Sequence, residues 1–505
     1  MPDDVATATR AVVVAALESA RTPGARTELE EILGRLDGPL RLAIAGKVKS
    51  GKSTLLNALL GEELAPTDAG ECTKIVTWYV NGPAPQVQLY PRDGLAPEDR
   101  PFSRDGALDV DLGSYAPERV DRLVVHWPTS RLRELTLLDT PGIASISAEI
   151  SERTHRVLAA TDNRVPTADA VLYLLRHAHA SDVRFLESFH DDELAHGTPM
   201  NAVGVLSRSD EIGSCRLDAM DVAARVASRY ESDHRLRRLC PVVVPVDSLL
   251  GYAAATLREA EFVPLARIAQ APPEDIARLL LTVDRLQAER ASVEVTQIER
   301  SHLLSRLGLY GVRLSVELIR SGAISNATGL ADHLAEVSGL NRLRMVVLRQ
   351  FLDRSRVLKA RSAIAAVEEV LRRGECTDPD ALLRRLEQVQ AGAHEFEELR
   401  LLQQLRAGSV EVGTGRAEDL DRLLGGSGHD SASRLGTPPD ASADEVREAA
   451  LDALGVWQRL AVHPLSSRSA QLAARTAIRT IEGIVASSWA PNGAERAGTG
   501  PAEPT

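Results

Sequence analysis

Residues Leu40 to Leu60 read LRLAIAGKVKSGKSTLLNALL, and the pattern of this segment is the strongest indication of the fold of the chain. A short apolar run of strand length leads into a glycine-bounded loop, and a segment with helical apolar spacing follows. The loop from Gly46 to Ser53 fits G-x-x-x-x-G-K-[ST], which a strand and a helix flank in phosphate-binding loops. A chance Gly-Lys turn before a core helix is the alternative. The order of strand, loop and helix favours phosphate binding.

The residue types in the loop suit a triphosphate bound with Mg²⁺. Gly46 and Gly51 allow the backbone to curl so that successive N–H groups point at one anion. Lys52 would reach the β- and γ-phosphates, and the Ser53 hydroxyl would be a ligand of Mg²⁺. The helix that follows adds the positive end of its dipole. The other loop residues that we predict to contact the nucleotide are Lys47, Lys49, Ser50 and Thr54.

Length and composition narrow the class of protein. A chain of 505 residues is too long for one core, so two or three domains are expected. Hydrophobic residues make up 44% and aromatic residues only 3%, which favours long helices over sheets outside the nucleotide fold. The net charge of -12 argues against nucleic acid as the main partner. Any contact with an anionic membrane must therefore be local.

The cysteines and the N-terminus indicate a reducing compartment. The four cysteines lie far apart, with no C-x-x-C pair and no His at metal spacing, so we predict reduced structural thiols at Cys72, Cys215, Cys240 and Cys376. The start, MPDDVATATR, is acidic where a signal peptide would be basic. No apolar run approaches the roughly 20 residues that span a bilayer. We predict a cytoplasmic chain, with peripheral contact at the inner face of the cell membrane left open.

Strands alternate with helical stretches after the loop. Six apolar or β-branched runs are predicted strands: Ile75 to Val80, Val120 to Trp127, Leu135 to Leu138, Ala170 to Leu175, Ala202 to Leu206 and Val242 to Val246. The Pro- and Gly-rich segment from Asn81 to Pro117 indicates short surface strands and turns. The motifs follow strand ends, which predicts an α/β doubly wound sheet with its ligand at the carboxyl edge.

Two segments next to these strands match the positions of nucleotide switches. A Thr between the loop helix and the second strand would sense Mg²⁺ and the γ-phosphate. Thr73 lies immediately before the strand and is our prediction, with Thr67 as the alternative. Asp139 begins D-T-P-G, where the carboxylate could hold Mg²⁺ through water and Gly142 could donate its N–H to a γ-phosphate. D-T-P-G alone can be a simple turn, but its position after a phosphate-binding loop favours a switch.

The base is predicted to bind at two later strand ends. Ser207-Arg208-Ser209-Asp210 occupies the place of the [NT]-K-x-D box of GTPases, in which the Asp accepts two hydrogen bonds from guanine. Asp210 can do this, and Arg208 could lie along the base. Ser207 and Arg208 depart from the usual residues, which weakens the assignment of guanine over adenine. The backbone of Asp247 and Ser248 would close over the base.

The rest of the chain is predicted to be helical. Val5 to Leu36 has helical spacing with a break near Thr22, and either lies alone on the first domain or joins a distant bundle. Beyond Leu249 we predict helices at Leu279 to Ala291, His302 to Arg320, Leu340 to Arg373, Pro379 to Gln404, Asp419 to Leu424, Asp444 to Leu460 and Arg468 to Ser487. Asp378 is a candidate N-cap. Together these helices predict a bundle that projects from the head.

The predicted division follows from these patterns. Residues 1–37 are predicted to form an N-terminal helical segment, 38–350 a nucleotide-binding domain with its core at 40–250, 351–490 an elongated helical bundle, and 491–505 a disordered tail. Two candidate membrane segments stand out, Leu307 to Ile319 and Leu423 to Leu435. The first carries two charges and favours a buried helix, and the second is polar. Direct lipid binding and docking to a companion protein both stay open.

GKVKSGKST, Thr73, DTPG and SRSD follow one another in the order found in Ras-like GTPases. The intervals between them and the long helical remainder resemble bacterial dynamin-like proteins. GKSTLLNALLG, PTDAGECTKIVTWY, SRSDEIG, the SGL segment at Ser338 and the AVHPL segment at Ala461 are similar to the isoniazid-inducible IniC group of actinobacterial dynamin-like proteins. This resemblance runs from about Leu40 to about Ile484.

The resemblance implies a Mg²⁺-dependent GTPase whose heads dimerise across the nucleotide and whose helical neck and trunk remodel membranes. Eukaryotic dynamins have Gln and Ser in the middle of the phosphate loop, where they organise a monovalent cation; here these positions are Val48 and Lys49. We predict that the Lys49 charge replaces the cation, so that Lys52, Thr73 and Lys49 are the catalytic residues. The alternative is an exposed Lys49 that faces a partner head.

Two functions remain in competition. The first is a GTPase with slow basal turnover, accelerated by head pairing, that deforms or fuses membrane, and the resemblance links it to cell-envelope stress or drug tolerance. The second is a GTP-gated scaffold that docks to a companion dynamin-like protein without binding lipid itself. A nucleic-acid-acting ATPase is disfavoured by the acidic charge and by D-T-P-G.

Overall fold

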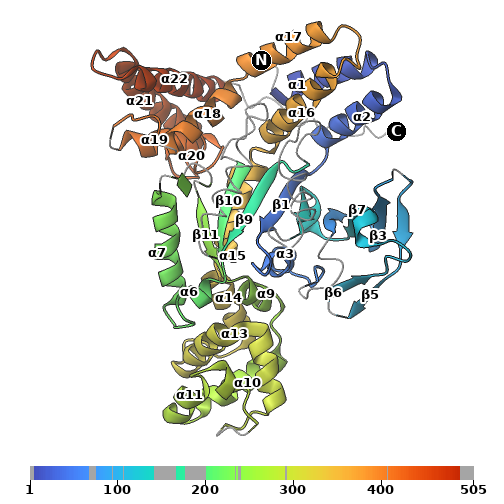
Figure 1. Cartoon of the computed structure of the whole chain (residues 1–505). Coiled ribbons are helices and arrows are strands. Elements are labelled where there is room, and N and C mark those ends of the chain that lie inside the picture. The colour runs from blue at the N-terminus through green and yellow to red at the C-terminus, as the bar shows by residue number, and fades with distance from the viewer. Residues whose placement is uncertain are drawn as a thin grey trace, which may run out of the picture. The chain divides into compact units, whose positions relative to one another are not determined.

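The computed structural model describes residues 5–66, 75–93, 95–105, 107–141, 167–176, 201–233, 235–236, 240, 242–289, 293–406, 408–413 and 415–488 (Figure 1). The chain divides into two compact units, residues 1–389 and 390–505. This division lies later than the boundary that we predicted at residue 350. Helix α17 (Pro379–Gly392) runs across it. Its predicted start is confirmed, because the amide of Ala381 donates to Asp378 Oδ1 at 3.3 Å.

A mixed sheet of nine strands, counted within the described ranges, forms the centre of unit 1. Its order is β11-β10-β9-β1-β8-β2-β7-β3-β4. The bounds are β1 Leu40–Gly46, β2 Val76–Asn81, β3 Gln86–Pro91, β4 Glu98–Arg100, β7 Val120–Trp127, β8 Leu135–Asp139, β9 Ala170–Leu175, β10 Ala202–Ser207 and β11 Val243–Val246. All six predicted later strands are present. The segment from Asn81 to Pro117 supplies β3, β4 and a separate hairpin of β5 (Phe102–Asp105) and β6 (Ala107–Val110).

Parallel pairing brings the predicted motifs to one edge of the sheet. Strand β1 lies between β8 and β9 and is parallel to both, with Ile44 beside Asp139 and Gly46 beside Leu174. Strand β10 is parallel to β9 and β11, and Ser207 is beside Val246. Strand β2 is antiparallel to β8 and begins the extension through β7, β3 and β4. The loops after β1, β8, β10 and β11 therefore meet at the same carboxyl edge.

The main core lies under the phosphate loop. Helix α3 (Lys52–Leu60) buries Leu55, Leu56 and Leu60 against apolar side chains of the sheet, including Leu42 and Ile44 of β1. These residues are spaced on one helical face, so the burial that anchors the helix also fixes its N-terminus at the carboxyl edge. Helix α15 (Leu340–Val347) contributes to the same core.

A helical insertion with its own core follows β11. It consists of α9 (Ser248–Thr256), α10 (Glu259–Gln270), α11 (Pro273–Leu279), α12 (Val283–Leu286), α13 (Gln297–Arg320) and α14 (Ala327–Val337) (Figure 1). Leu307, Tyr310 and Val316 are buried in this core, so the first candidate membrane segment is a buried helix, as its charges indicated.

The predicted helix from Leu279 to Ala291 is wrong. Helix α11 ends at Leu279, and within residues 280–289, the part of that range that the structure describes beyond it, the short helix α12 is the only α-helix. The reason lies at Arg300, which is almost fully buried and donates to the carbonyls of Leu286 and Ala288. These carbonyls are satisfied by a guanidinium instead of helical amides, which holds the segment irregular.

The N-terminal segment joins a helix from far along the chain. Helices α1 (Val5–Glu18) and α2 (Pro23–Asp37) pack on each other and on α16 (Ser355–Arg372) (Figure 1). The link between them is fixed by main-chain bonds, because Arg21 N donates to Glu375 O at 2.8 Å and Thr377 N donates to Ser19 O at 2.9 Å. These helices are one packed group within unit 1.

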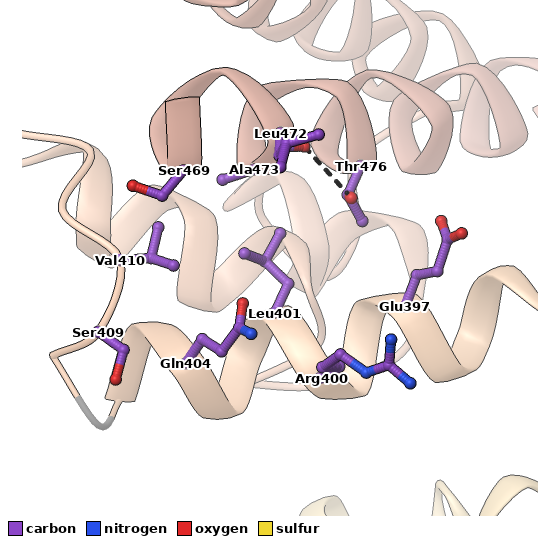
Figure 2. A pocket seen from close by; sticks show the side chains of 10 residues that line it. All are labelled: Glu397, Arg400, Leu401, Gln404, Ser409, Val410, Ser469, Leu472, Ala473 and Thr476. Atoms are coloured by element: carbon purple, nitrogen blue, oxygen red, sulfur yellow. Dashed lines mark hydrogen bonds between the residues drawn. The ribbon is translucent and has the colours of Figure 1, made fainter. Parts of the chain in front are cut away.

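Unit 2 is a helical assembly. It contains α18 (His394–Arg406), α19 (Arg416–Leu423), α20 (Ser431–Leu435), α21 (Ala443–Val462) and α22 (Arg468–Ser488), and α21 and α22 pack as a helical hairpin. A pocket with a volume of about 340 Å³ lies between α18, the segment at Val410 and α22, and Figure 2 shows the side chains that line it. Apolar Leu401, Val410 and Leu472 line it together with polar side chains such as Gln404 and Ser469. This pocket contains none of the predicted nucleotide residues.

The described residues bear on the predictions about the cysteines and about helices that could span a bilayer. Cys215, Cys240 and Cys376 carry free thiols, as predicted, and Cys72 lies outside the described residues. Among the described helices, none combines the length and the apolar character that a membrane span requires. The predicted disordered tail, residues 491–505, also lies outside the described part of the chain.

Candidate nucleotide-binding site

The phosphate loop has the curled backbone that its sequence predicts. Gly51 has φ 91° and precedes α3, while Lys49 has φ 62°, a left-handed conformation that is uncommon outside glycine. A Cβ on Gly46 would lie 2.9 Å from both Leu174 O and Ser50 Oγ. Gly46 therefore allows close packing of β1 on β9, and the loop turns immediately after it.

Lys52 lies with its ammonium inside the loop. Its Nζ donates to Gly46 O at 3.2 Å and to Lys47 O at 3.1 Å. Burial lowers the pKa of Lys52, while the nearby Asp139 carboxylate opposes that shift. The side chain is therefore already oriented at the loop, where a phosphate oxygen could take part in its hydrogen bonding.

Ser53 and Asp139 meet beside Lys52 and fit a Mg²⁺ ion. Ser53 Oγ donates to Asp139 Oδ2 at 3.4 Å. Burial raises the pKa of Asp139 to about 6, although Lys52 and Ser53 act in the opposite direction. No group of three or more His, Cys, Asp or Glu side chains forms a metal cage within the described residues. One hydroxyl and one carboxylate suit Mg²⁺, which takes its other ligands from water and phosphate.

Thr140 anchors the start of D-T-P-G to the phosphate strand. It is buried, and its Oγ1 donates to Ile44 O at 2.9 Å. The position of Thr140 inside D-T-P-G did not by itself indicate this anchoring role. Gly142 and both switch candidates, Thr67 and Thr73, lie outside the described residues.

The predicted base-reading segment is held from two sides. Buried Ser207 donates to Leu175 O at 3.2 Å, and buried Ser209 donates to Leu206 O at 2.8 Å. Arg208 has φ 52° and donates to Glu211 Oε1 at 2.8 Å. Arg176, at the end of β9, pairs with the other oxygen of Glu211. The segment therefore has a fixed backbone, and an exposed guanidinium lies next to the predicted base reader.

Asp210 and Asp247 are neighbouring carboxylates. Burial, followed by the charge of Glu211, raises the pKa of Asp210. Burial, followed by the charge of Asp210, raises the pKa of Asp247 to about 7. Asp247 Oδ1 accepts a hydrogen bond from Leu250 N at 3.0 Å and so caps α9. A base donor between them would offset the mutual repulsion of two such carboxylates.

A turn far along the chain supports the loop after β11. The amide of Asp247 donates to Ser338 O at 2.9 Å. Gly339 has φ 76°, and a Cβ there would lie 2.2 Å from Pro245 O. Only glycine fits so close to β11. The SGL segment at Ser338 therefore lies next to the base-binding end of the site, which its sequence pattern did not indicate.

Three buried polar atoms at this edge have no hydrogen-bond partner within the described structure. They are Ser50 Oγ at the phosphate loop, Asp139 Oδ1 after β8 and Ser248 Oγ after β11. Buried polar atoms are nearly always hydrogen-bonded in folded proteins. All three belong to residues predicted to contact the nucleotide or its metal, and they lie at or just after the carboxyl ends of three separate strands.

The fold and these motifs define a dynamin-type head. Residues 42–206 match the sequence model described as the Dynamin family. The chain is 39% identical to the isoniazid-induced protein IniC of Mycobacterium tuberculosis over 459 residues, which cover 91% of this chain and 92% of that protein. The chain therefore belongs to the bacterial dynamin-like proteins, in the IniC group.

More distant relatives match mainly part of the chain. A bacterial dynamin-like protein of Nostoc punctiforme is 28% identical over 217 residues, 40% of this chain and 29% of that protein. The isoniazid-induced protein IniA of M. tuberculosis is 35% identical over 142 residues, 27% of this chain and 21% of that protein. A solved bacterial dynamin pair aligns over 96% of this chain and 74% of that chain at 11% identity, with a TM-score of only 0.30.

Proposed function

We propose that the chain binds GTP with Mg²⁺, hydrolyses it and couples hydrolysis to membrane remodelling. The observation that carries this proposal is the set of three buried, unpartnered polar atoms around a curled phosphate loop, at Ser50, Asp139 and Ser248. A nucleotide that spans the carboxyl edge would supply partners at its phosphate, metal and base ends. Membership of a family of GTPases gives the proposal its second support.

The phosphates would be held by Gly46, Lys47, Ser50, Gly51 and Thr54 of the loop and by the Lys52 ammonium. Ser53 and Asp139 would hold Mg²⁺, which would neutralise charge on the phosphate oxygens. Thr73 and Gly142 would complete the switches around the γ-phosphate. Because the chemistry of phosphoryl transfer requires mainly positioning and electrostatic stabilisation, these groups suffice without a covalent intermediate.

Selection of guanine is assigned to Asp210. Its carboxylate would accept hydrogen bonds from the N1 and N2 groups, which adenine cannot donate in the same arrangement. Arg208 would lie along the base with Ser207 fixing its strand end, and Asp247 and Ser248 would close the loop over it. The Arg208–Glu211 pair at 2.8 Å supports an ordered position for the guanidinium.

Lys49 is proposed as a catalytic charge in the middle of the loop. Its backbone is left-handed, and its side chain is exposed at the phosphate loop. There it would offset charge that develops during phosphoryl transfer, in place of a monovalent cation.

Partners follow from the family. We propose that heads pair across the nucleotide, and that a companion dynamin-like protein assists; IniA, a relative of this chain, shares the isoniazid-induced name with IniC. The GTPase domain would be residues 38–350, with 1–37 and 351–490 as neck and trunk. The chain would act at the inner face of the cell membrane under envelope stress. The competing proposal is a GTP-gated scaffold that never touches lipid.

Calorimetry on the full chain tests the nucleotide. Titration with GTP, GDP and ATP in Mg²⁺ should give heat with the guanosine nucleotides and much less with ATP, and GTP turnover should rise with protein concentration as heads pair. Absence of heat with GTP and GDP would refute the proposal. Co-sedimentation with vesicles, with and without GTP, separates the two functions, because the scaffold would stay in the supernatant.

A further inference from the structure

The hairpin of α21 and α22 carries the exposed large apolar side chains of unit 2. Within the described part of this unit, those side chains are Leu451, Val456, Val462, Leu465 and Leu472. The two most exposed lie at the turn between the helices, Val462 at 78% and Leu465 at 90%. These two exposed apolar side chains lie three positions apart in the sequence, so they form a small apolar surface at the turn.

The turn is ordered, so this exposure is built into the fold. His463 Nδ1 accepts a hydrogen bond from Leu465 N at 3.2 Å, and His463 O accepts one from Ser466 N at 3.1 Å. Helix α22 then begins with Ser467 Oγ accepting from Ala470 N at 3.1 Å. Pro464 fixes its own φ within the turn. These local hydrogen bonds fix the backbone on both sides of Leu465 while its side chain remains exposed.

Charge changes sign along the hairpin. No Asp or Glu occurs between Asp452 and Glu482, although this chain has a net charge of -12. The same interval holds four arginines, Arg459, Arg468, Arg475 and Arg479. The opposite half of α21 is acidic, with Asp444, Glu445, Glu448 and Asp452. The end of the hairpin that exposes Val462 and Leu465 is thus the basic end.

Two of these arginines flank the turn without protein partners. Arg459 lies on the last turn of α21 and Arg468 on the first turn of α22, and both are exposed. Neither side chain forms a hydrogen bond or ion pair with the described residues, whereas the Arg447 side chain at the acidic end pairs with Asp444. Unpaired cations beside exposed apolar side chains are the pattern that interfacial lipid binding uses.

We propose that this turn docks on an anionic lipid bilayer. Val462 and Leu465 enter the interface between head groups and acyl chains, and Arg459 and Arg468 bind head-group phosphates. This inference rests on the proposed membrane function and names its contact site. It replaces the two candidate segments from the sequence, because Leu307 to Ile319 is buried and Leu423 to Leu435 contributes no strongly exposed large apolar side chain.

Vesicle binding by the full chain tests the apolar part. Vesicles of phosphatidylglycerol and phosphatidylethanolamine should bind the protein, and the double variant Val462→Asp/Leu465→Asp should bind at least about tenfold more weakly. Leu451→Asp is the matched control, because Leu451 is 53% exposed on the same hairpin but lies at its acidic end. It should bind like the parent.

Charge reversal tests the basic part. Arg459→Glu and Arg468→Glu should each weaken binding about fivefold or more, and the parent's binding should fall with added salt and on pure phosphatidylcholine. Arg416→Glu is the control, an exposed arginine of α19 in the same unit. Its vesicle affinity should change far less than that of the turn variants.

The readouts separate this proposal from the nucleotide function. Circular dichroism and GTP turnover without vesicles should be the same in the turn variants and the parent, so a loss of binding cannot come from misfolding. Lipid binding without turnover would refute the GTPase and leave the turn intact. The proposal is overturned if the parent binds no vesicle, if the double Asp variant binds like the parent, or if the turn variants change only the oligomeric state.

Discussion

Buried carboxylates behave in opposite ways at the nucleotide edge and in the helical unit. Burial raises the pKa of Asp139 to about 6 and that of Asp247 to about 7. Burial would also raise the pKa of Glu398, but hydrogen bonds from His394 and Thr480 and the charge of Arg434 lower it to about 2. The difference lies in the partners that the chain itself supplies.

The hydrogen-bond partners of the individual carboxylate oxygens explain the difference between these pKa values. Glu398 Oε2 accepts from Arg434 Nη2 at 2.7 Å, and Glu398 Oε1 accepts from Thr480 Oγ1 at 2.7 Å. Asp139 has Ser53 Oγ at 3.4 Å on one oxygen and no partner on Oδ1. Both oxygens of Glu398 have partners within unit 2, whereas Asp139 at the nucleotide edge keeps bonding capacity for a ligand. Function and stability should therefore be separable by mutation.

The largest expected effect is at Lys52. Lys52→Ala should reduce GTP turnover by on the order of a thousandfold, because the ammonium at the phosphates is lost. Stability should change little, since burial already disfavours this charge in the folded protein. Turnover and a thermal melt of the same preparation measure the two quantities.

Lys359 provides the matched control for that variant. Its Nζ also donates to two main-chain carbonyls, Leu36 O and Gly38 O, each at 2.9 Å, but these lie where α2 leads into the start of β1. Lys359→Ala removes a similar pair of hydrogen bonds away from the carboxyl edge and should keep most of the turnover. Equal losses of GTP turnover in the two variants would show that the position of Lys52 at the carboxyl edge has no special role in catalysis.

A substitution at Glu398 is expected to lower the stability of unit 2 and to leave nucleotide binding unchanged. Glu398→Gln leaves Arg434 without its charge partner and should destabilise unit 2 by about 3 kcal/mol. Hydrogen exchange of α18 and α22 should report it, while nucleotide binding by the head should persist. Glu397→Gln is the control, because Glu397 is the more exposed neighbour and its ion pairs to His394 and Arg479 are 3.6 Å long. If Glu398→Gln left the stability of unit 2 unchanged, the proposed stabilising role of this carboxylate would be wrong.

The same carboxylate gives unit 2 a pH dependence. The folded pKa of Glu398, about 2, is below its ordinary value of 4.5. Its stabilising contribution is therefore fully present above about pH 4.5 and is lost as the pH falls toward 2. Glu398→Gln should remove this part of the acid sensitivity of α18 and α22.

Local spacing was enough to predict the strands and the positions of the phosphate loop, D-T-P-G and SRSD. These motifs depend on residues close together in sequence, and parallel pairing then gathers them at one edge. The support of Asp247 by Ser338 and the anchoring of Thr140 on Ile44 were missed. Both are contacts between distant segments, which periodicity does not encode.

The turn at Val462 was missed for a related reason. An Ala- and Leu-rich hairpin predicts helices and a core, and only the packed structure distinguishes buried Trp457 and Leu460 from exposed Val462 and Leu465. The failed helix at Leu279 to Ala291 has the same origin, since its carbonyls are satisfied by Arg300 from a later helix. Sequence patterns specify the elements, whereas tertiary contacts decide which polar groups stay unsatisfied.

A smaller effect is expected from pH at Asp139. Because its pKa is about 6 in the free head, the carboxylate takes up a proton below that pH, and Mg²⁺ must displace it. Affinity for Mg²⁺-GTP should therefore fall about tenfold per pH unit below 6. The free head should gain stability over the same fall, since its raised pKa holds the proton more tightly than the unfolded chain does. Calorimetry at pH 7.5 and 5 measures the first effect, and Asp139→Asn should flatten it.

The smallest expected effect distinguishes a catalytic Lys49 from a merely exposed one. The residue keeps a left-handed backbone at φ 62° without being glycine, and its side chain is exposed in the middle of the phosphate loop. If its charge replaces a monovalent cation, Lys49→Ala should slow turnover about tenfold, equally in sodium and potassium, and Lys49→Arg should restore most of it. Vesicle-free turnover at several protein concentrations separates this from head pairing, because a pairing defect would disappear at high concentration and a chemical defect would not. Unchanged turnover in Lys49→Ala would place the side chain outside the chemistry and would leave Lys52 and the metal as the cations that offset the developing charge.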